Sequence, residues 1–133
     1  MGKLTVTSLG RPIYLKVNAE NLSDQLEGQV KISPSCTLLQ VADNLLEARA
    51  SIRLEGYKSL VDDGKFSPNF FIFCELYQQF KTDRALLKEE LQQQYLISAC
   101  KVPVFAMCVQ KAYELASLLG IHGINITPIP PRE

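Results

Sequence analysis

Residues 38–53 read LLQVADNLLEARASIR, and the period of the apolar residues in this stretch decides which fold is expected for the chain. At about 100° per residue, most of its apolar residues fall on one face of a helix: Leu38, Val41, Ala42, Leu45, Leu46 and Ile52. The opposite face carries Gln40, Asp43, Asn44 and Glu47. The pattern predicts an amphipathic helix that begins after Pro34 and ends before Gly56.

Arg49 and Arg53 fall on the apolar side of this predicted helix. A guanidinium group cannot lose its proton, and burying it without a partner costs several kcal/mol. Three interpretations stay open. The arginine stems cover the core while the heads reach water or a carboxylate such as Glu75; a partner chain supplies the carboxylate; or the arginines bind a small anionic ligand or a phosphate.

Three more helices are expected further along the chain. Ser67 and Pro68 are typical of a helix start and open a second helix that runs to Phe80. A third begins at Thr82 or Asp83. The fourth covers 104–119 and ends at Gly120, and because it is apolar around most of its circumference we expect it to be the most buried.

Apolar and polar residues alternate in the first 32 residues, as they do in β-strands. Segments 4–7, 13–17 and 29–32 predict a small antiparallel meander, which a short strand at 124–127 could join. The expected fold class is therefore α+β, with a small N-terminal sheet packed on a bundle of about four helices. We expect one domain, made of a meander (1–32), a helical bundle (36–120) and a short strand with a proline-rich tail (121–133).

Composition narrows the possible functions. The chain has 133 residues, and its 14 Lys and Arg balance its 14 Asp and Glu. A neutral chain has no general attraction to nucleic acid or to anionic lipid, so nucleic-acid binding is not the leading expectation. The N-terminus lacks the apolar core of a signal peptide, and no apolar run reaches the ~20 residues of a membrane span. These features predict a soluble cytoplasmic protein that does not contact a membrane.

Residues that carry catalysis are scarce. His122 is the only histidine, and no glycine-rich phosphate-binding motif is present. The cysteines are irregularly spaced among apolar residues, which is typical of reduced core thiols and not of a zinc site; they are Cys36, Cys74, Cys100 and Cys108. We therefore predict no catalytic residue, no metal and no cofactor.

Two apolar residues occupy polar sides of predicted helices. Phe71 shares a helix side with Glu75, and Met107 lies in the narrow polar strip of helix 104–119. Large apolar groups in such places often contact another chain. The sequence therefore predicts a non-catalytic protein-interaction module, an assembly, adaptor or scaffold component that acts as an oligomer or in a larger complex. Its interface candidates are Arg49, Arg53, Phe71 and Met107.

Two other functions stay open. One is a domain or enzyme that binds a small anionic ligand in a pocket near Arg49 and Arg53, between the first helix and the sheet. The other is weak nucleic-acid binding, whose affinity would fall steeply with salt.

Overall fold

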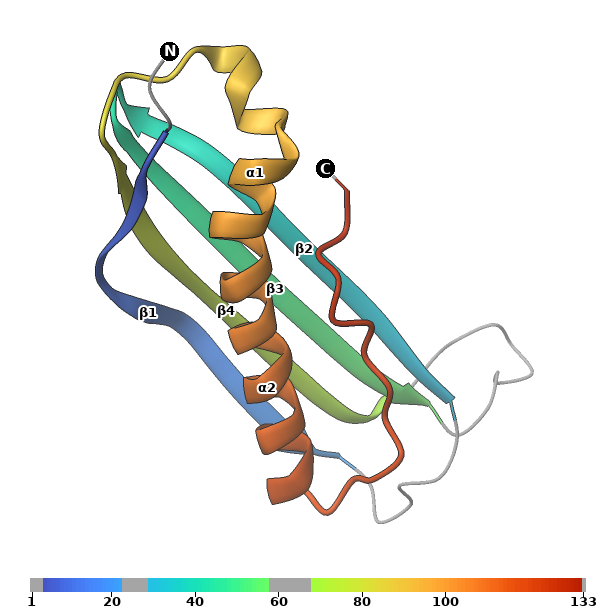
Figure 1. Cartoon of the computed structure of the whole chain (residues 1–133). Helices are drawn as coiled ribbons and strands as arrows, with labels where there is room; N and C mark the ends of the chain where they lie inside the picture. Colours follow the sequence, from blue (N-terminus) through green and yellow to red (C-terminus); the bar gives the residue numbers. More distant parts are fainter. Residues whose placement is uncertain (1–3, 23–28, 58–67, 133) are drawn as a thin grey trace.

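Four strands form one antiparallel sheet, and a long helix lies across one of its faces in the computed structural model (Figure 1). The structure describes residues 4–22, 29–57 and 68–132. The strands are β1 (Val6–Asn21), β2 (Gln29–Ala42), β3 (Leu45–Tyr57) and β4 (Pro68–Thr82), in the order β1-β4-β3-β2. The helical segments that follow are η1 (Lys88–Gln92), α1 (Gln94–Leu96), η2 (Ile97–Lys101) and α2 (Val102–Leu118).

The stretch 38–53 is a β-hairpin, so the helix predicted there is wrong. The chain turns at Asp43 and Asn44, and β3 then buries every second side chain. The buried set is Leu46, Ala48, Ala50, Ile52 and Leu54. Because side chains alternate between the faces of a strand, Arg49 and Arg53 lie on the face of the sheet opposite to this set. With a helical period of 3.6 residues the two arginines fall among apolar side chains. With the strand period of two they lie on the face opposite to the apolar set, so no arginine has to be buried.

The second predicted helix is also a strand, β4, which lies between β1 and β3. Its buried side chains alternate and include Phe70, Ile72, Cys74 and Leu76. Two of the three residues between them, Phe71 and Phe73, are apolar as well and occupy the other face, which also carries Glu75. A run that is apolar on both faces has no period of two for the sequence to reveal, and it resembles a buried helix.

Strand β1 combines two strands that the sequence predicted separately, at 4–7 and 13–17. The strand bends at Gly10, whose φ of +76° is a left-handed conformation that favours glycine. Its pairing with β4 shifts register between Leu9 and Ile13 and again between Tyr14 and Lys16. β1 therefore pairs with β4, the last of the four strands along the chain, and the predicted N-terminal meander does not form.

The single long helix among the described residues is α2, which agrees with the prediction of a helix at 104–119. Gly120 has a φ of +77°, the left-handed conformation that commonly ends a helix. The third predicted helix is reduced to the short segments η1 and α1. A bundle of about four helices is thus contradicted, because the described part of the chain is mainly an antiparallel sheet.

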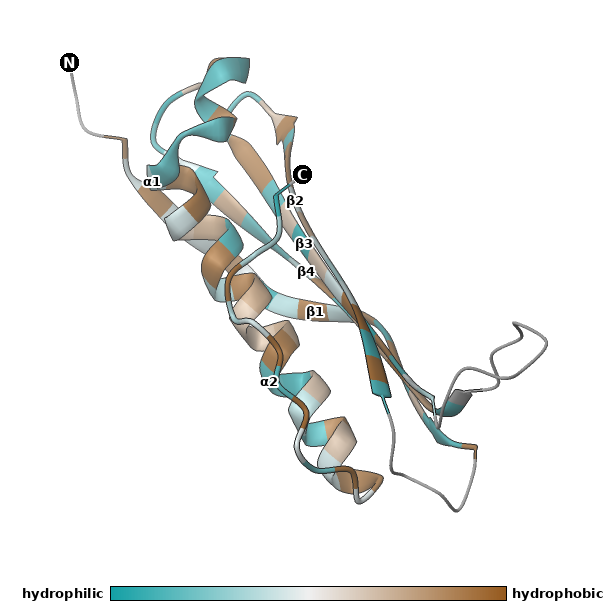
Figure 2. Cartoon of the chain, turned by 90° about the vertical axis from the view of Figure 1, so that its right-hand side faces the viewer, coloured by the Kyte–Doolittle hydropathy of each residue, from teal (hydrophilic) through white to brown (hydrophobic). Residues whose placement is uncertain are grey.

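The core lies between the sheet and α2, and Figure 2 shows these two layers from the side. The side chains that α2 buries are Val104, Phe105, Cys108, Val109, Ala112, Leu115 and Ala116. All four cysteines are buried and free, as the sequence predicted. The tail, which we define as residues 121–132, runs beside α2 on the side of β2 (Figure 1). It contains no strand, so the strand predicted at 124–127 is wrong.

Candidate protein-interaction surface

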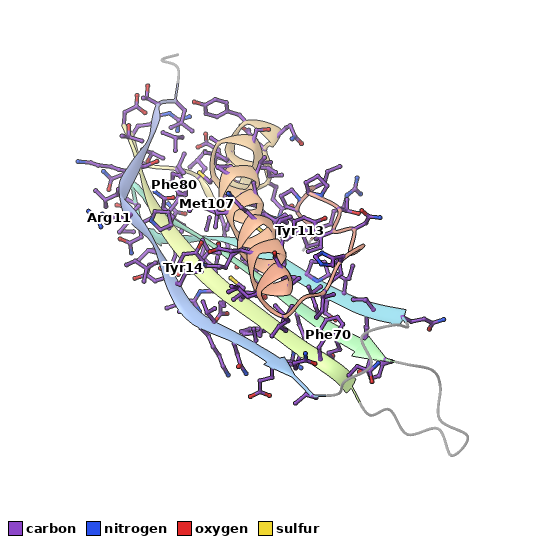
Figure 3. All side chains as sticks on the ribbon, turned by 90° about the horizontal axis from the view of Figure 1, so that it is seen from below. Arg11, Tyr14, Phe70, Phe80, Met107 and Tyr113 are labelled. Carbon is purple, nitrogen blue, oxygen red and sulfur yellow. The ribbon has the colours of Figure 1, made fainter. Side chains whose placement is uncertain are left out.

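The two long sides of α2 differ in what covers them. We call the side next to β2 the tail flank, and the side next to β1 the β1 flank. Figure 3 shows Tyr113 pointing toward the tail, and Met107 and Tyr14 on the opposite side of the helix. The faces of the sheet differ too, because α2 and the tail cover one of them, and we call the other the open face (Figure 2).

On the tail flank, the chain covers its own apolar surface. Ile121 and Ile126 are each 6% exposed and belong to the core, and Ile124 packs against it. The backbone N–H of Ile126 donates a hydrogen bond of 2.7 Å to the hydroxyl oxygen of Tyr113 on α2. Side-chain burial and this hydrogen bond hold the tail against the helix.

On the β1 flank, apolar side chains of the same kind remain exposed. Tyr14 and Val17 are 40% and 44% exposed, although Val17 pairs with the buried Cys74 and so faces the covered side of the sheet. Lys111 of α2 lies over the Tyr14 ring, with Nζ 5.1 Å from the ring centroid. Partial burial raises the pKa of the Tyr14 hydroxyl. Leu118, two helical turns beyond Lys111 on this flank, is 77% exposed.

Strand β1 itself carries most of the exposed apolar surface of the sheet. Its large apolar side chains with at least two fifths of their surface exposed are Leu9, Ile13, Tyr14, Leu15 and Val17. They project on both faces of the strand, and Leu15 lies at the register shift, where it has no partner on β4. Strands of a monomeric sheet normally hide such residues, so this density marks β1 as the candidate interaction surface.

The two edge strands of the sheet also differ in where proline lies along them. β1 and β2 are the edge strands, and each has one side that no other strand in the described residues occupies. Pro34 interrupts the hydrogen-bonding groups of β2 near its middle. In β1, Pro12 lies before segment 13–21, which contains no proline and has one register shift, between Tyr14 and Lys16. On an edge strand every second residue turns its backbone N–H and C=O groups away from the sheet, so segment 13–21 has groups that can pair with another strand.

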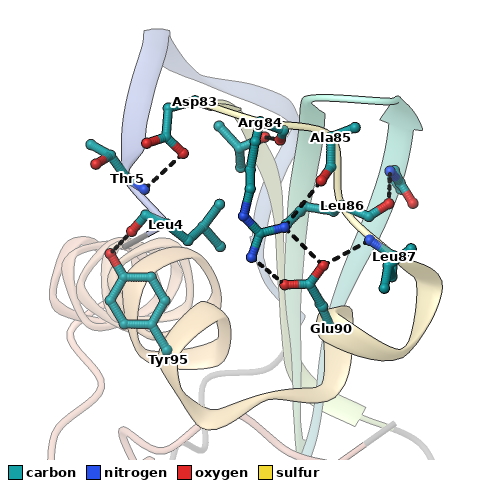
Figure 4. Close-up of polar contacts among 11 residues, drawn as sticks. Leu4, Thr5, Asp83, Arg84, Ala85, Leu86, Leu87, Glu90 and Tyr95 are labelled. Atoms are coloured by element: carbon teal, nitrogen blue, oxygen red, sulfur yellow. Dashed lines mark hydrogen bonds and ion pairs between the residues drawn. The ribbon is translucent and has the colours of Figure 1, made fainter. Parts of the chain in front are cut away.

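A group of polar contacts fixes the N-terminal end of β1 (Figure 4). The backbone N–H of Thr5 donates to Asp83 Oδ1 at 3.0 Å, and the backbone N–H of Asp83 donates to the carbonyl of Thr5 at 3.1 Å. The Tyr95 hydroxyl donates to the carbonyl of Leu4 at 2.9 Å. The hydrogen bond from Thr5 lowers the pKa of Asp83. β1 is thus tied down at one end and free along its outer edge.

The same group of contacts holds the segment that leads to α1. Arg84 donates two hydrogen bonds to the carboxylate of Glu90, at 2.7 and 3.0 Å, and the backbone N–H of Leu87 donates to the same carboxylate at 2.9 Å. These contacts, the Arg84 hydrogen bond first, lower the pKa of Glu90 to about 2. The pair is exposed to solvent, so it orients this segment more than it stabilises the fold.

Three of the four residues predicted from the sequence lie on the open face of the sheet. The Arg53 guanidinium carbon is 5.4 Å from the centroid of Phe71 and 5.6 Å from that of Phe73. Arg49 lies over a different ring, Tyr77, at 5.9 Å. The structure therefore places Arg53 next to Phe71, whereas Arg49 lies further along the sheet and Met107 lies on the β1 flank of α2.

The partner expected for Arg49 is different from the one observed. The sequence predicts the carboxylate of Glu75 as a partner. In the structure Arg49 pairs instead with Glu47, two residues earlier on the same strand, at 3.4 Å. In the part of the chain that the structure describes, no helix lies over these arginines, because α2 and the tail are on the other face. The pocket expected between a first helix and the sheet does not form, since residues 38–53 contain no helix.

Sequence reasoning missed the exposed residues of β1. Because Ile13, Leu15 and Val17 alternate with Tyr14 and Lys16, the sequence predicts that the three share one covered face of the sheet. The register shift between Tyr14 and Lys16 turns Leu15 out of this alternation, so the three do not share a face. The available signal was the high apolar content of an N-terminal strand that Gly10 and Pro12 interrupt, which predicts an irregular edge strand.

The described residues offer little to a metal or to thiol chemistry. They contain no group of three or more His, Cys, Asp or Glu side chains that could hold a metal ion. Burial raises the pKa of the Cys100 thiol to about 12. Cys108 donates to the carbonyl of Cys74 at 3.5 Å in the core.

In the part of the chain described, no helix has the length and apolar character needed to cross a membrane.

Comparison with known proteins identifies the fold and not a family. No protein-family model matches the chain, and no curated protein matches it. A solved structure of the Mycobacterium tuberculosis SecB-like chaperone Rv1957, in complex with a ChAD peptide from the HigA1 antitoxin, is similar with a TM-score of 0.61 and 11% identity. The match covers 96% of this chain and 92% of that one.

A second solved structure shares this architecture. It is a protein of unknown function from Streptococcus agalactiae, with a TM-score of 0.51 and 12% identity. The match covers 95% of this chain and 99% of that protein. At these identities the likeness shows a common fold alone.

Proposed function

We propose that this chain is a non-catalytic protein-interaction module that takes up an extended apolar segment of another polypeptide along β1. The observation that carries the proposal is the concentration of exposed large apolar side chains on one edge strand, most of them within the proline-free segment 13–21. A strand added at this edge would satisfy backbone groups and bury these side chains in one step.

Burial of apolar side chains and backbone hydrogen bonds must both contribute to the free energy of such binding. Fully burying a Val, Leu or Ile side chain contributes roughly 1.5–3 kcal/mol, so covering the exposed half contributes about 1 kcal/mol each. Four such side chains give about 4 kcal/mol, which is at the low end of the ~4–15 kcal/mol that association costs. Backbone hydrogen bonds along segment 13–21 must supply the rest, and we expect an affinity on the order of micromolar.

The fold is consistent with this proposal. The SecB-like chaperone that shares it was solved with a bound peptide, and a protein-interaction role agrees with that. The non-catalytic part of the proposal is supported by the sequence, which has one histidine and no phosphate-binding motif. We also propose a cytoplasmic location, which the four free cysteines support because such thiols persist in a reducing compartment.

One substitution on β1 tests the proposal. Val17→Lys places a charge on the strand, and the probe is fluorescein-labelled α-lactalbumin kept unfolded by reduction and alkylation. We expect fluorescence anisotropy to show at least tenfold weaker binding than to the unchanged chain. The matched control is Ile129→Lys on the tail, where the side chain is 71% exposed and far from β1 in sequence. Equal loss in both variants, or in neither, would contradict the proposal.

The same variants separate a foreign segment from a second copy of this chain. Two copies can pair through their β1 edges, and an oligomer formed in this way would compete with the probe. Light scattering behind a sizing column measures the mass of each variant. If Val17→Lys converts an oligomer to a monomer of 14.9 kDa, the edge serves self-association as the sequence predicted.

A second candidate is binding of an anionic group on the open face. It is favoured by Arg53, which is exposed and whose guanidinium carbon lies over the rings of Phe71 and Phe73, 5.4 and 5.6 Å from their centroids. Arg53→Lys keeps the charge but loses the planar contact, so binding of a carboxylate-rich probe peptide would weaken several-fold. Unchanged binding of that peptide would eliminate this candidate.

A further inference from the structure

The tail lies in a groove of the protein without being part of a regular element. From Ile121 to Arg132 the chain has neither helix nor strand. It leaves α2 through two glycines with left-handed backbone, Gly120 at φ +77° and Gly123 at φ +81°. Two such glycines make a turn that reverses the chain, and the tail then runs back along α2 beside β2 (Figure 1).

Beyond this turn, alternate side chains of the tail face the protein. Ile126 is buried and Ile124 is half-buried, whereas Asn125, Thr127 and Ile129 are exposed. The backbone N–H of Ile126 donates a hydrogen bond to the Tyr113 hydroxyl oxygen on α2. Alternate buried side chains and a backbone hydrogen bond are also the contacts by which an extended peptide is bound.

A pocket of about 560 Å³ lies beside the last residues of the tail. Its apolar lining comes from β2, η1, η2 and α2, through Leu38, Leu91, Ile97 and Val102, and its polar lining includes Gln92, Gln94 and Lys101. Ile129, Pro130, Pro131 and Arg132 of the tail line it as well, and Ile129 remains 71% exposed. The tail therefore borders this pocket on one side and leaves its volume open.

We infer that α2 and β2 form a second peptide groove, which the tail occupies and from which a partner segment displaces it. The partner is an extended segment with apolar side chains two residues apart followed by prolines, as in Ile124, Ile126 and Pro128. Side chains at this spacing project on one side of an extended chain, and proline keeps the chain extended at little entropic cost. A large apolar residue three or more positions later would enter the pocket. This inference does not depend on β1.

A cleavable tail tests the inference in the folded full-length chain. A protease recognition sequence replaces the exposed residues His122 and Gly123, and the purified protein is cut after folding. The probe is a fluorescein-labelled peptide of residues 124–133. We expect saturable binding to the cut protein and at least tenfold weaker binding to the uncut protein, because the attached tail competes. A probe with Ile126→Asp should not bind.

The outcomes separate this groove from β1. Val17→Lys in the cut protein should leave binding of the tail peptide unchanged, and Tyr113→Phe should weaken it several-fold. If Val17→Lys abolishes binding, the peptide occupies β1 and the inference is overturned. It is also overturned if the cut tail never exchanges with the probe, or if circular dichroism shows that the protein unfolds when the tail leaves. In that case the tail is a fixed part of the core.

Discussion

The tail flank and the β1 flank of α2 are made of similar residues but end in opposite states. On the tail flank Ile126 is 6% exposed, and on the β1 flank Val17 is 44% exposed. Each flank contains a tyrosine next to the helix, Tyr113 on one side and Tyr14 on the other (Figure 3). The difference lies in coverage, because among the described residues the tail covers one flank and no segment covers the other.

The comparison shows which part of its apolar surface a small sheet with one helix covers and which part it leaves exposed. One helix is about 10 Å wide and the four-stranded sheet is wider, so α2 cannot cover both edge strands. It packs on the central strands β3 and β4, and the tail completes the β2 side. In the described part of the chain, the β1 side is left without such a cover. The following substitutions test this division, starting with the largest expected effect.

Replacing a buried tail residue should be the most damaging change. Ile126→Asp puts a charge into the core, and we expect the free energy of unfolding to fall by about 3 kcal/mol or more. The matched control is Ile129→Asp, which we expect to change it by less than about 0.5 kcal/mol because Ile129 is exposed. Urea unfolding followed by circular dichroism measures both. Similar small effects would mean that the tail flank is as open as the β1 flank.

The two tyrosines give a matched pair with a smaller difference. Tyr113→Phe removes the oxygen that accepts the Ile126 N–H, and we expect a loss of about 1 kcal/mol in urea unfolding. Tyr14→Phe keeps the ring under Lys111 and should change stability by less than about 0.5 kcal/mol. A larger loss at Tyr14 would show that the β1 flank is held by a polar contact as well.

Changing β1 should alter binding without altering stability. Val17→Lys extends a charged group into solvent from a position that is already half exposed, so we expect the urea midpoint to shift by less than about 0.5 kcal/mol in free energy. The proposed loss of binding can then be assigned to the surface itself. Destabilisation above about 2 kcal/mol would place Val17 in the core and remove the contrast between the flanks.

Acid should weaken the contacts that hold the N-terminal end of β1. The folded-state pKa of Glu90 is about 2, below its ordinary value of 4.5, so its contribution is complete above pH 4.5 and is lost as the pH falls toward 2. Asp83 shifts in the same direction. Because both groups are exposed, the effect should be the smallest of the four. Glu90→Gln should flatten the stability profile over this range, and Glu89→Gln should not.

How far the fold could be predicted varies with the element. The helix at 104–119 was found because its sequence is helical in pattern and ends at glycine. Stretch 38–53 was misassigned because its first half fits a period near 3.6, and the strict alternation begins only at Leu46. In 68–80, apolar residues on both faces hide the period of two. In both stretches, 38–53 and 68–80, burial in the folded sheet favours the strand conformation, and local preference does not.

The residues proposed from the sequence as an interface were chosen for an incorrect reason, and their role stays a prediction. Arg49, Arg53 and Phe71 were singled out as misplaced on helices, but they belong to strands and project from the open face of the sheet, where Arg53 and Phe71 are next to each other. Met107 lies on the β1 flank. The exposed residues of β1 were not predicted, because exposure depends on where α2 lies across the sheet. That placement brings together residues more than 80 positions apart, such as Tyr14 and Lys111.

The sequence by itself determined the long helix, its glycine end, the strand character of 13–17 and 29–32, and the burial of four reduced cysteines. These features depend on local patterns and on composition. The tertiary structure alone decided the sheet order, the pairing of β1 with β4, the side of the arginines, and the contrast between a filled and an open flank. Strand pairing over long sequence separations and the limited width of one helix are properties of the assembled layers, and no local stretch of sequence encodes them.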